Sequence, residues 1–336
     1  MGSYEEMKEL YKDILANYIQ TPNEQILYQG QKLSRKSLEN EISPEDIVSM
    51  HKEVIEDIYP DVPDRLLHSL DFLLEVMISY GLAHREHQTL KNKQRELHSE
   101  IEVAANVQQT LLGTTIPEIP SIEIGAVSVP AKQMSGDYYH FVKDENNHLN
   151  IALADVIGKG IPAAMCMSMI KYAMESLPDS RKNPSYVLQN LNTVVEQNVD
   201  PSMFITMFYG DYNIESNSLT FASAGHEPGF YYDEKEDTFH DLEAKGLVLG
   251  VERNITYQQY IREVNVGDMI ILLTDGVTEC RNEEGFIERE DIIELIRKYM
   301  HLPTQELVDS IYRELERLQN FQLRDDFTLI VLKRLV

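Results

Sequence analysis

The hydrophobic residues of the first 80 positions recur at the spacing of a helix. Between Tyr4 and Tyr80, apolar side chains stand three or four positions apart in the runs 7–18, 47–58 and 66–78. Residues at this spacing share one helix face, so the pattern predicts three or four amphipathic helices. Ser43-Pro44 is a typical helix start, an N-cap followed by proline. No catalytic combination of side chains stands out here, and we expect residues 1–82 to form a helical partner-binding domain.

The segment 83–120 begins with a seven-residue repeat. Apolar residues stand at every seventh position, and mostly polar ones at the alternate seam positions: Ala83, Leu90, Leu97, Ala104 and Leu111, with His87, Gln94, Ile101 and Gln108. Polar seam residues lower stability while they specify register, so this pattern predicts a weak parallel coiled coil. The expected switch and dimerisation positions are Leu90, Leu97, Ile101, Ala104 and Leu111. A plain connector helix packed on a neighbour is the alternative.

Beyond position 120 the pattern changes to short apolar runs, which are typical of strands. The predicted strands are 122–129, 137–142, 149–154, 203–212, 219–224, 229–232, 269–273 and 327–332. The predicted helices are 160–177, 184–199, 289–300 and 304–318. Most neighbouring strands follow one another without a helix between them. This order predicts an α+β domain of packed layers over 121–336, rather than a doubly wound parallel sheet.

The chain is strongly acidic, since 30 Lys and Arg against 56 Asp and Glu give a net charge of −26. A surface of this charge repels nucleic acid and anionic membranes, so we expect neither as a partner. No stretch approaches about 18 uninterrupted apolar residues, and we expect a soluble protein. The two cysteines, Cys166 and Cys280, lie far apart and outside any metal-binding spacing, which favours a reducing cytoplasm.

Four short acidic motifs stand where an apolar run meets a turn: Ser135-Gly136-Asp137, Asp155-Val156-Ile157-Gly158-Lys159-Gly160, Asp275-Gly276 and Asp325-Asp326-Phe327-Thr328. Carboxylates gathered from several strand ends suit Mg²⁺ or Mn²⁺, hard cations that act on phosphoryl oxygens. A single Asp-Gly at a strand end is typical of an ordinary turn. Four of them in one chain predict a metal site.

Other phosphate and metal motifs do not fit. Gly158-Lys159-Gly160 lacks both the earlier glycine of a P-loop and the Ser or Thr that should follow the lysine directly. The pair His226-Glu227 has no HExxH spacing, and the chain has no GxSxG elbow. A P-loop enzyme, a zinc protease and a serine hydrolase are therefore disfavoured.

From about 121 to 336 the chain resembles the PPM family of metal-dependent serine/threonine phosphatases, in its bacterial SpoIIE-type branch. The resemblance rests on five stretches: 129–139 (VPAKQMSGDYY), 154–164 (ADVIGKGIPAA), 223–228 (SAGHEP), 274–279 (TDGVTE) and 325–328 (DDFT). It implies a sandwich of two β-sheets flanked by helices. It also implies a phosphomonoesterase that uses two Mn²⁺ or Mg²⁺ ions.

The resemblance implies a role for each acidic motif. Asp155 corresponds to the carboxylate that bridges the two ions, and the backbone carbonyl of Val156 joins it. Asp275 and Asp325 correspond to further ligands of the same metal pair. Asp137 matches the acidic position of the first motif, which is expected to bind through water.

Four other residues are candidates with a less certain role. Asp326 occupies the place where many relatives have Asn, so it is a possible ligand. Eukaryotic members hold the substrate phosphate with an Arg ahead of the first acidic motif; this chain offers Lys132 there, and Lys159 elsewhere. His226 is either a general acid for the leaving serine or a loop histidine that bonds the backbone, and we favour the second.

The resemblance also implies partners. The expected substrate is a phosphorylated anti-anti-sigma factor (RsbV-like), whose dephosphorylation frees a general stress sigma factor. The expected activator is a kinase-like protein (RsbT-like) that binds residues 1–82 of a homodimer, orders the helices of 83–112 and completes the metal site. The alternatives are a metal-dependent phosphomonoesterase of another signalling branch and a catalytically silent regulatory binding module.

Overall fold

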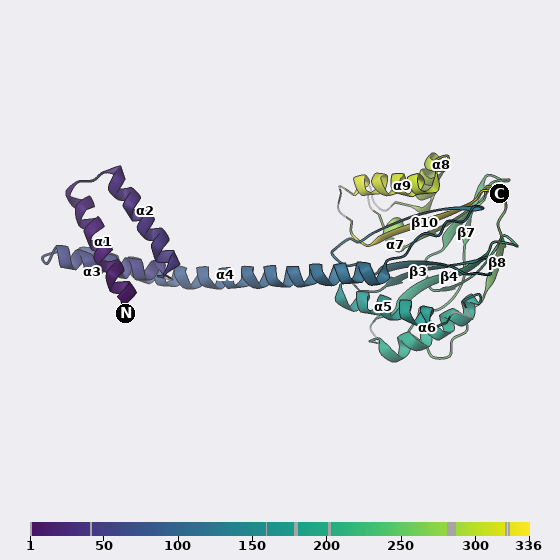
Figure 1. The fold of residues 1–336 in the computed structure, drawn as a ribbon, viewed down its shortest axis with the longest axis horizontal. Helices are drawn as coiled ribbons and strands as arrows, with labels where there is room; N and C mark the ends of the chain where they lie inside the picture. Colours follow the sequence, from purple (N-terminus) through teal and green to yellow (C-terminus); the bar gives the residue numbers. More distant parts are fainter. Residues whose placement is uncertain are drawn as a thin grey trace. The chain divides into compact units, whose positions relative to one another are not determined.

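The computed structural model describes residues 2–40, 42–158, 160–177, 181–200, 203–280, 287–319, 321 and 323–336. The chain divides into two compact units, Met1–His98 and Ser99–Val336. Figure 1 follows it from the helices of the first unit to the two sheets of the second. The domain boundaries expected at 82 and 120 stay predictions.

The first unit is helical. Its elements are α1 (Gly2–Gln20), α2 (Glu24–Glu39), α3 (Pro44–Ile58) and the first part of α4 (Asp64–Leu112). Ser43 caps α3 as the sequence predicts: its hydroxyl accepts a hydrogen bond from the Asp46 N–H at 3.2 Å, and the Asp46 carboxylate accepts one from the Ser43 N–H at 3.1 Å. Met7, Leu33 and Met50 form a small buried core.

Helix α4 runs unbroken for 49 residues. The sequence pattern describes this stretch as two segments, but Gly81 between them does not end the helix, because one glycine costs about 1 kcal/mol in a helix interior. By length and composition alone α4 could cross a membrane, and very little of its apolar stretch is buried. Asp71 and Glu75 interrupt that stretch, and one such helix is weak support for a membrane span.

The second unit holds two five-stranded sheets, whose named pairings are all antiparallel. One has the order β1-β10-β9-β6-β7 and the other β2-β3-β4-β5-β8. The strands are β1 (Ile122–Val129), β2 (Asp137–Lys143), β3 (His148–Val156), β4 (Ile205–Asn213), β5 (Ser218–Ala224), β6 (Gly229–Asp233), β7 (Thr238–Leu242), β8 (Tyr260–Glu263), β9 (Met269–Leu273) and β10 (Phe327–Arg334).

Helices cover the outer face of each sheet (Figure 1). α5 (Ile161–Glu175) and α6 (Pro184–Asn198) pack on the sheet of β2 to β5, and α8 (Arg289–Tyr299) and α9 (Thr304–Leu318) pack on the other. A third apolar cluster fills the space between the sheets. This four-layer arrangement confirms the predicted α+β sandwich flanked by helices.

The sequence pattern missed three short elements: β7, β8 and the single-turn helix α7 (Asp275–Thr278). β7 and β8 are outer strands of their sheets, and only Leu242 of their nine residues is buried. Strands this short with so few buried side chains carry no clear alternating pattern. Pairing with Tyr231 and Phe221 on the neighbouring strands defines these two elements.

Candidate metal centre

At one end of the sandwich, the space between the sheets changes from apolar to polar. Successive strand residues point to opposite faces, so alternate positions share one face. On β3 the residues that face the other sheet are Leu149, Ile151 and Leu153, and the next in this series is Asp155. Asp137 lies opposite Asp155 on β2 and therefore shares its face.

The other sheet ends in the same way. Ile330 on β10 and Leu272 on β9 lie in the apolar layer between the sheets, and two residues along the same faces stand Thr328 and Thr274. Ser128, opposite Thr328, is the corresponding residue of β1. Hydroxyls of one sheet thus face the carboxylates of the other. Their alternation with apolar neighbours is the signal in the sequence that could have pointed to these hydroxyls.

Asp137 is held by two threonines. Thr274 Oγ1 and Thr328 Oγ1 each lie 2.7 Å from Asp137 Oδ2, and both threonines are completely buried. Both hydroxyls donate to this oxygen. Thr274 Oγ1 then accepts from the Thr328 N–H at 3.1 Å, and Thr328 Oγ1 accepts from Ser128 Oγ at 2.9 Å. This network fixes the direction in which Asp137 points.

The site contains two pairs of carboxylates, and the two members of each pair repel each other. Burial, reinforced by the charge of Asp155, raises the pKa of Asp137 well above its usual value, and the two threonine hydroxyls oppose this shift. Burial, reinforced by the charge of Asp325, raises the pKa of Asp275 to about 6. Carboxyls placed this close favour protonation unless a positive charge joins them.

Asp326 anchors the loop that carries the first acidic motif. Its Oδ1 accepts a hydrogen bond from the Ala131 N–H at 2.7 Å, and its Oδ2 accepts one from the Gly136 N–H at 2.5 Å. Asp326 is 4% exposed. Both of its oxygens thus serve the backbone of 131–136. Asp325 differs, since its Oδ1 accepts a hydrogen bond from the Asp326 N–H at 2.9 Å.

A close backbone approach explains the glycine of the third motif. A Cβ at Gly276 would lie 1.9 Å from the carbonyl oxygen of Asp326, so a larger residue would push the two segments apart. Gly276 therefore brings Asp275, at the start of α7, next to 325–326. The glycine in Asp275-Gly276 thus allows the turn and also the close contact between this segment and residues 325–326.

The donor set fits a hard divalent cation. Among the described residues, no three or more His, Cys, Asp or Glu side chains are gathered closely enough to hold a metal ion already. The two repelling pairs, Asp137 with Asp155 and Asp275 with Asp325, nevertheless supply the oxygen ligands that Mg²⁺ and Mn²⁺ prefer. The like-charge repulsion that adds to burial in raising the pKa values of Asp137 and Asp275 is what a cation would relieve.

His226 is buried beside this end of the sheet. It is 7% exposed, its Nδ1 lies 2.9 Å from Thr206 Oγ1, and its Nε2 is buried with no hydrogen bond of good geometry to any described residue. Burial lowers the pKa of His226 to about 4, and a Leu273 backbone group offsets this in part. Thr206 stands opposite Asp155 on β4. The Nδ1 of His226 thus bonds a threonine hydroxyl, and the choice between a general acid and a loop histidine stays a prediction.

The remaining predicted residues lie apart from the carboxylates or cannot be placed. Lys132 is exposed, and no hydrogen bond or ion pair from it is described. Lys159 lies outside the described residues. Of the predicted seam positions, Leu90, Leu97 and Leu111 are exposed, whereas Ile101 and Ala104 are partly covered. The structure of one chain leaves the coiled coil a prediction.

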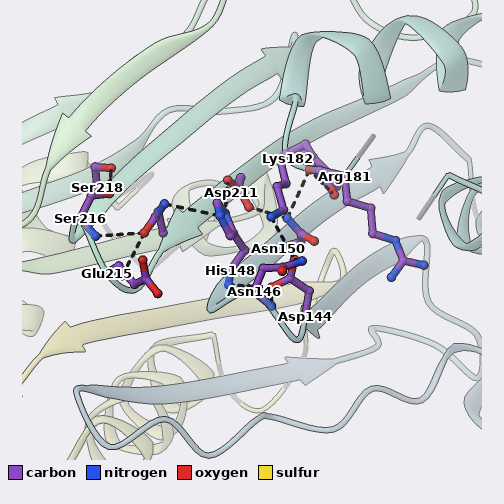
Figure 2. A network of polar contacts seen from close by, with 12 residues as sticks. Asp144, Asn146, His148, Asn150, Arg181, Lys182, Asp211, Glu215, Ser216 and Ser218 are labelled. Atoms are coloured by element: carbon purple, nitrogen blue, oxygen red, sulfur yellow. Dashed lines mark hydrogen bonds and ion pairs between the residues drawn. The ribbon is translucent and has the colours of Figure 1, made fainter. Parts of the chain in front are cut away.

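A second polar network lies at the other end of β3 (Figure 2). Asp211 accepts a hydrogen bond from Asn150 at 2.8 Å, and its Oδ2 lies 2.8 Å from His148 Nδ1. Asn150 also donates to the Arg181 carbonyl at 3.2 Å, which ties the segment before α6 to the sheet. Asp155 lies seven positions along the strand from His148, about 23 Å away. We assign this network an anchoring role, separate from the metal centre.

Comparison with known proteins identifies the family. Residues 145–335 match the family model of stage II sporulation protein E (SpoIIE), and residues 9–83 match the N-terminal domain of phosphoserine phosphatase RsbU. The chain is 60% identical to phosphoserine phosphatase RsbU of Bacillus subtilis (strain 168) over 336 residues, 100% of both chains. It is 29% identical to Protein IcfG of Synechocystis over 264 residues, which cover 70% of this chain and 41% of that protein.

Solved structures share the two-sheet domain. The SiaA-PP2C domain of Pseudomonas aeruginosa superposes with a TM-score of 0.60 at 17% identity, covering 72% of this chain and 98% of that one. The RsbU and RsbW domains of Rv1364c from Mycobacterium tuberculosis give a TM-score of 0.55 at 22% identity, covering 66% and 63%. At these identities the likeness shows the fold alone.

The fold and the family relationship together define a protein serine/threonine phosphatase of the PPM, or PP2C, class. Both parts of the chain also match one group within that class, the N-terminal helices by their family model and the whole length by sequence identity. The chain belongs to the RsbU group of the SpoIIE-type phosphatases.

Proposed function

We propose that this chain hydrolyses phosphoserine on a protein, with two Mn²⁺ or Mg²⁺ ions held at the acidic end of the sandwich. The observation that carries the proposal is the position of Asp137 opposite Asp155, next to the second carboxylate pair, Asp275 and Asp325. Oxygen ligands that repel one another in the free protein are suited to a divalent cation. The 60% identity to a phosphoserine phosphatase supports the same chemistry.

Each acidic residue has its own part in the proposal. Asp155 and the backbone carbonyl of Val156 would hold the ions together with Asp275 and Asp325. Asp137 would act through water, because its Oδ2 is already engaged by two threonine hydroxyls. This scheme gives Asp326 the role of holding the loop rather than the metal, since each of its oxygens accepts a backbone hydrogen bond.

The bound cations would supply a water of lowered pKa at neutral pH and would neutralise the phosphoryl oxygens. The chain itself supplies position. The two threonines orient Asp137, and Asp326 holds the loop in front of it. His226 stays neutral and buried, so it supports Thr206 rather than protonating the leaving serine. Lys132, which is exposed ahead of the first motif, is the proposed contact for the substrate phosphate.

The full-length relationship extends the proposal to partners. We assign the substrate as a phosphorylated RsbV-like anti-anti-sigma factor of the general stress response, and the activator as an RsbT-like protein that binds residues 1–82. The match of 9–83 to the RsbU N-terminal domain supports this assignment. Cys166 and Cys280 are free and buried, which supports a reducing cytoplasm as the compartment.

The decisive experiment measures Mn²⁺-dependent phosphate release from the phosphoserine anti-anti-sigma protein, with and without the RsbT-like partner. Wild type is expected to need metal and to respond to the partner. Asp155→Asn is expected to lose turnover. Mutating a residue that only hydrogen-bonds to a metal ligand typically lowers metal affinity or activity about 10 to 100-fold, and loss of the ligand itself should cost more. Full activity of Asp155→Asn, or hydrolysis by wild type without any divalent cation, would overturn the proposed centre.

A proline tests the proposed coiled coil. Leu97 is 56% exposed on α4, so Leu97→Pro breaks the helix without removing a buried side chain. The variant is expected to keep the slow metal-dependent hydrolysis of the unactivated enzyme and to lose the response to the partner. Leu97→Ser, which keeps the helix, is the matched control. Equal activation of the proline variant and wild type would argue against a helical dimer as the switch.

A further inference from the structure

Gln108 of α4 binds the backbone of the loop in front of the metal centre. Its side-chain Nε2 donates to the Ser135 carbonyl at 2.7 Å, and its Oε1 accepts from the Ser135 N–H at 3.2 Å. The two bonds are reciprocal, as between the backbones of paired strands. They also determine which atom of the amide is oxygen, because the Ser135 N–H donates and the carbonyl accepts.

The burial of Gln108 departs from that of its neighbours in α4. Gln108 is 8% exposed, whereas Asn106, Val107 and Gln109 are exposed. A buried amide that lost its partners would leave polar groups unpaired at a cost of about 1–3 kcal/mol each, so the side chain is held firmly where it lies. Helix α4 therefore contacts the first acidic motif through a specific pair of hydrogen bonds.

The loop is held from several sides. While Gln108 bonds Ser135, the Gly136 N–H donates to Asp326 and the Gly136 carbonyl accepts from the Val156 N–H at 3.2 Å. The Asp137 N–H donates to Ser135 Oγ at 3.1 Å. Each backbone N–H from Ser135 to Asp137 thus has its own partner. Asp326 and Val156 belong to the metal-centre motifs, and Gln108 is the partner that comes from α4.

A cavity lies on the side of the loop where Gln108 binds. Its volume is about 500 Å³, and its lining includes Gln108, Gln133, Ser135 and Asp137. The loop can therefore shift toward this space when Gln108 no longer holds it, which would carry Asp137 away from the position that its two threonines define. Tight packing does not oppose such a shift on this side.

We propose that Gln108 is a positioning residue for the phosphatase reaction: it holds Ser135 so that Asp137 stays in place to bind the metal through water. This inference rests on the metal centre of the proposed function. If the inference holds, metal affinity depends on α4 staying helical up to Gln108, so that this side chain can bond Ser135. Gln108 acts through the loop and does not touch substrate or metal.

The chain offers a control for the reciprocal hydrogen-bond pair in Gln305 of α9, a residue that is exposed where Gln108 is buried. Its amide makes the same reciprocal pair with a backbone, accepting from the Ala126 N–H at 3.2 Å and donating to the Ala126 carbonyl at 3.1 Å. Ala126 lies in the middle of β1, away from the acidic motifs. Gln108→Met and Gln305→Met each remove one such pair while keeping an unbranched side chain that suits a helix.

The test titrates Mn²⁺ into each metal-free full-length protein by calorimetry and follows amide hydrogen exchange of Ser135. Gln108→Met is expected to bind Mn²⁺ about tenfold more weakly than wild type, which is the loss typical of residues that orient a metal ligand without binding the metal. Its Ser135 N–H should exchange faster, and saturating Mn²⁺ should restore most of its turnover. Gln305→Met should bind Mn²⁺ as wild type does. Gln108→Ala repeats the test should the methionine variant not fold.

The outcomes separate the two proposals. Unchanged Mn²⁺ affinity in folded Gln108→Met, or an equal loss in Gln305→Met, would overturn the positioning role while leaving the enzyme intact. Wild type that neither binds Mn²⁺ nor releases phosphate would instead refute the proposed metal centre. A tenfold loss confined to the Gln108 variants, reversed by metal, is the result that supports the inference.

Discussion

Thr328→Val is the sharpest probe of how the fold prepares its metal centre. Valine keeps the shape of threonine and removes its hydroxyl. In the structure that hydroxyl donates to Asp137 Oδ2 at 2.7 Å in a completely buried setting. The Thr274 hydroxyl remains as a second donor to the same oxygen. The substitution therefore removes one of two hydrogen bonds from a carboxylate whose charge the metal centre requires.

The expected magnitude follows from the charge of the acceptor. A hydrogen bond to an ionised group contributes about 1.5–3 kcal/mol, and one to a neutral group about 0.5–1.5 kcal/mol. The raised pKa of Asp137 favours its protonated form before metal binds, and a cation favours the ionised form. The metal-bound state thus loses about 1 kcal/mol more than the metal-free state. That difference corresponds to about fivefold weaker Mn²⁺ binding.

Isothermal titration of Mn²⁺ into wild type and Thr328→Val measures this difference directly. Ser128→Ala is the control, because Ser128 bonds Thr328 Oγ1 and does not reach the carboxylate. The control is expected to shift Mn²⁺ affinity by less than about twofold, because Ser128→Ala removes a hydrogen bond between two neutral hydroxyls and not one to the carboxylate. Equal Mn²⁺ affinity in wild type and folded Thr328→Val would refute the argument that the threonine stabilises an ionised Asp137.

Three further outcomes follow from the same site. Because a pKa of about 6 leaves Asp275 protonated in acid, the apparent Mn²⁺ affinity should fall about tenfold between pH 7 and pH 5; a flat pH profile would contradict this. Because His226 keeps a pKa of about 4 in the fold against 6.5 unfolded, its contribution to stability is complete above pH 6.5 and is lost toward pH 4. By pH 5 urea unfolding should show wild type losing about 2 kcal/mol more than His226→Asn, and parallel curves would exclude a buried neutral histidine. Asp325→Asn should weaken Mn²⁺ binding, whereas Asp326→Asn should chiefly speed the amide exchange of Gly136. Weaker Mn²⁺ binding in Asp326→Asn with unchanged binding in Asp325→Asn would make Asp326 the ligand instead.

Much of the architecture could be predicted because its signals are local. The strand boundaries of β1 and β9 and the helix boundaries of α9 agree with the predicted ranges residue for residue. The apolar patterns of β9 and α9 are strong, since their inward residues are fully buried. β7 and β8 were missed because they are short and have few buried side chains, so that no alternating pattern stands out. The carboxylate motifs were visible because each is a short run of adjacent residues.

The roles of individual residues within those motifs were harder to predict. The sequence places Asp325 and Asp326 side by side, with no indication of which faces the loop. The structure turns Asp326 toward the N–H groups of Ala131 and Gly136, nearly 200 positions earlier in the chain. Thr274 and Thr328 went unnoticed because a single threonine at a strand end has many ordinary roles. Gln108 was interpreted as a seam residue, and the structure places it against Ser135.

By itself, the sequence of this protein determined the helical N-terminal segment, the α+β class of the rest and the acidic motifs of a metal-dependent phosphatase. These follow from the spacing of apolar residues and from adjacent residues in short motifs, which act within a few positions of the chain. The tertiary structure alone decided that Asp137 lies opposite Asp155, that two threonines of the other sheet orient Asp137, and that α4 reaches the loop through Gln108. The physical reason is that these contacts join segments tens to hundreds of residues apart. Strand pairing and the packing of the two sheets bring them together, and no local pattern records that arrangement.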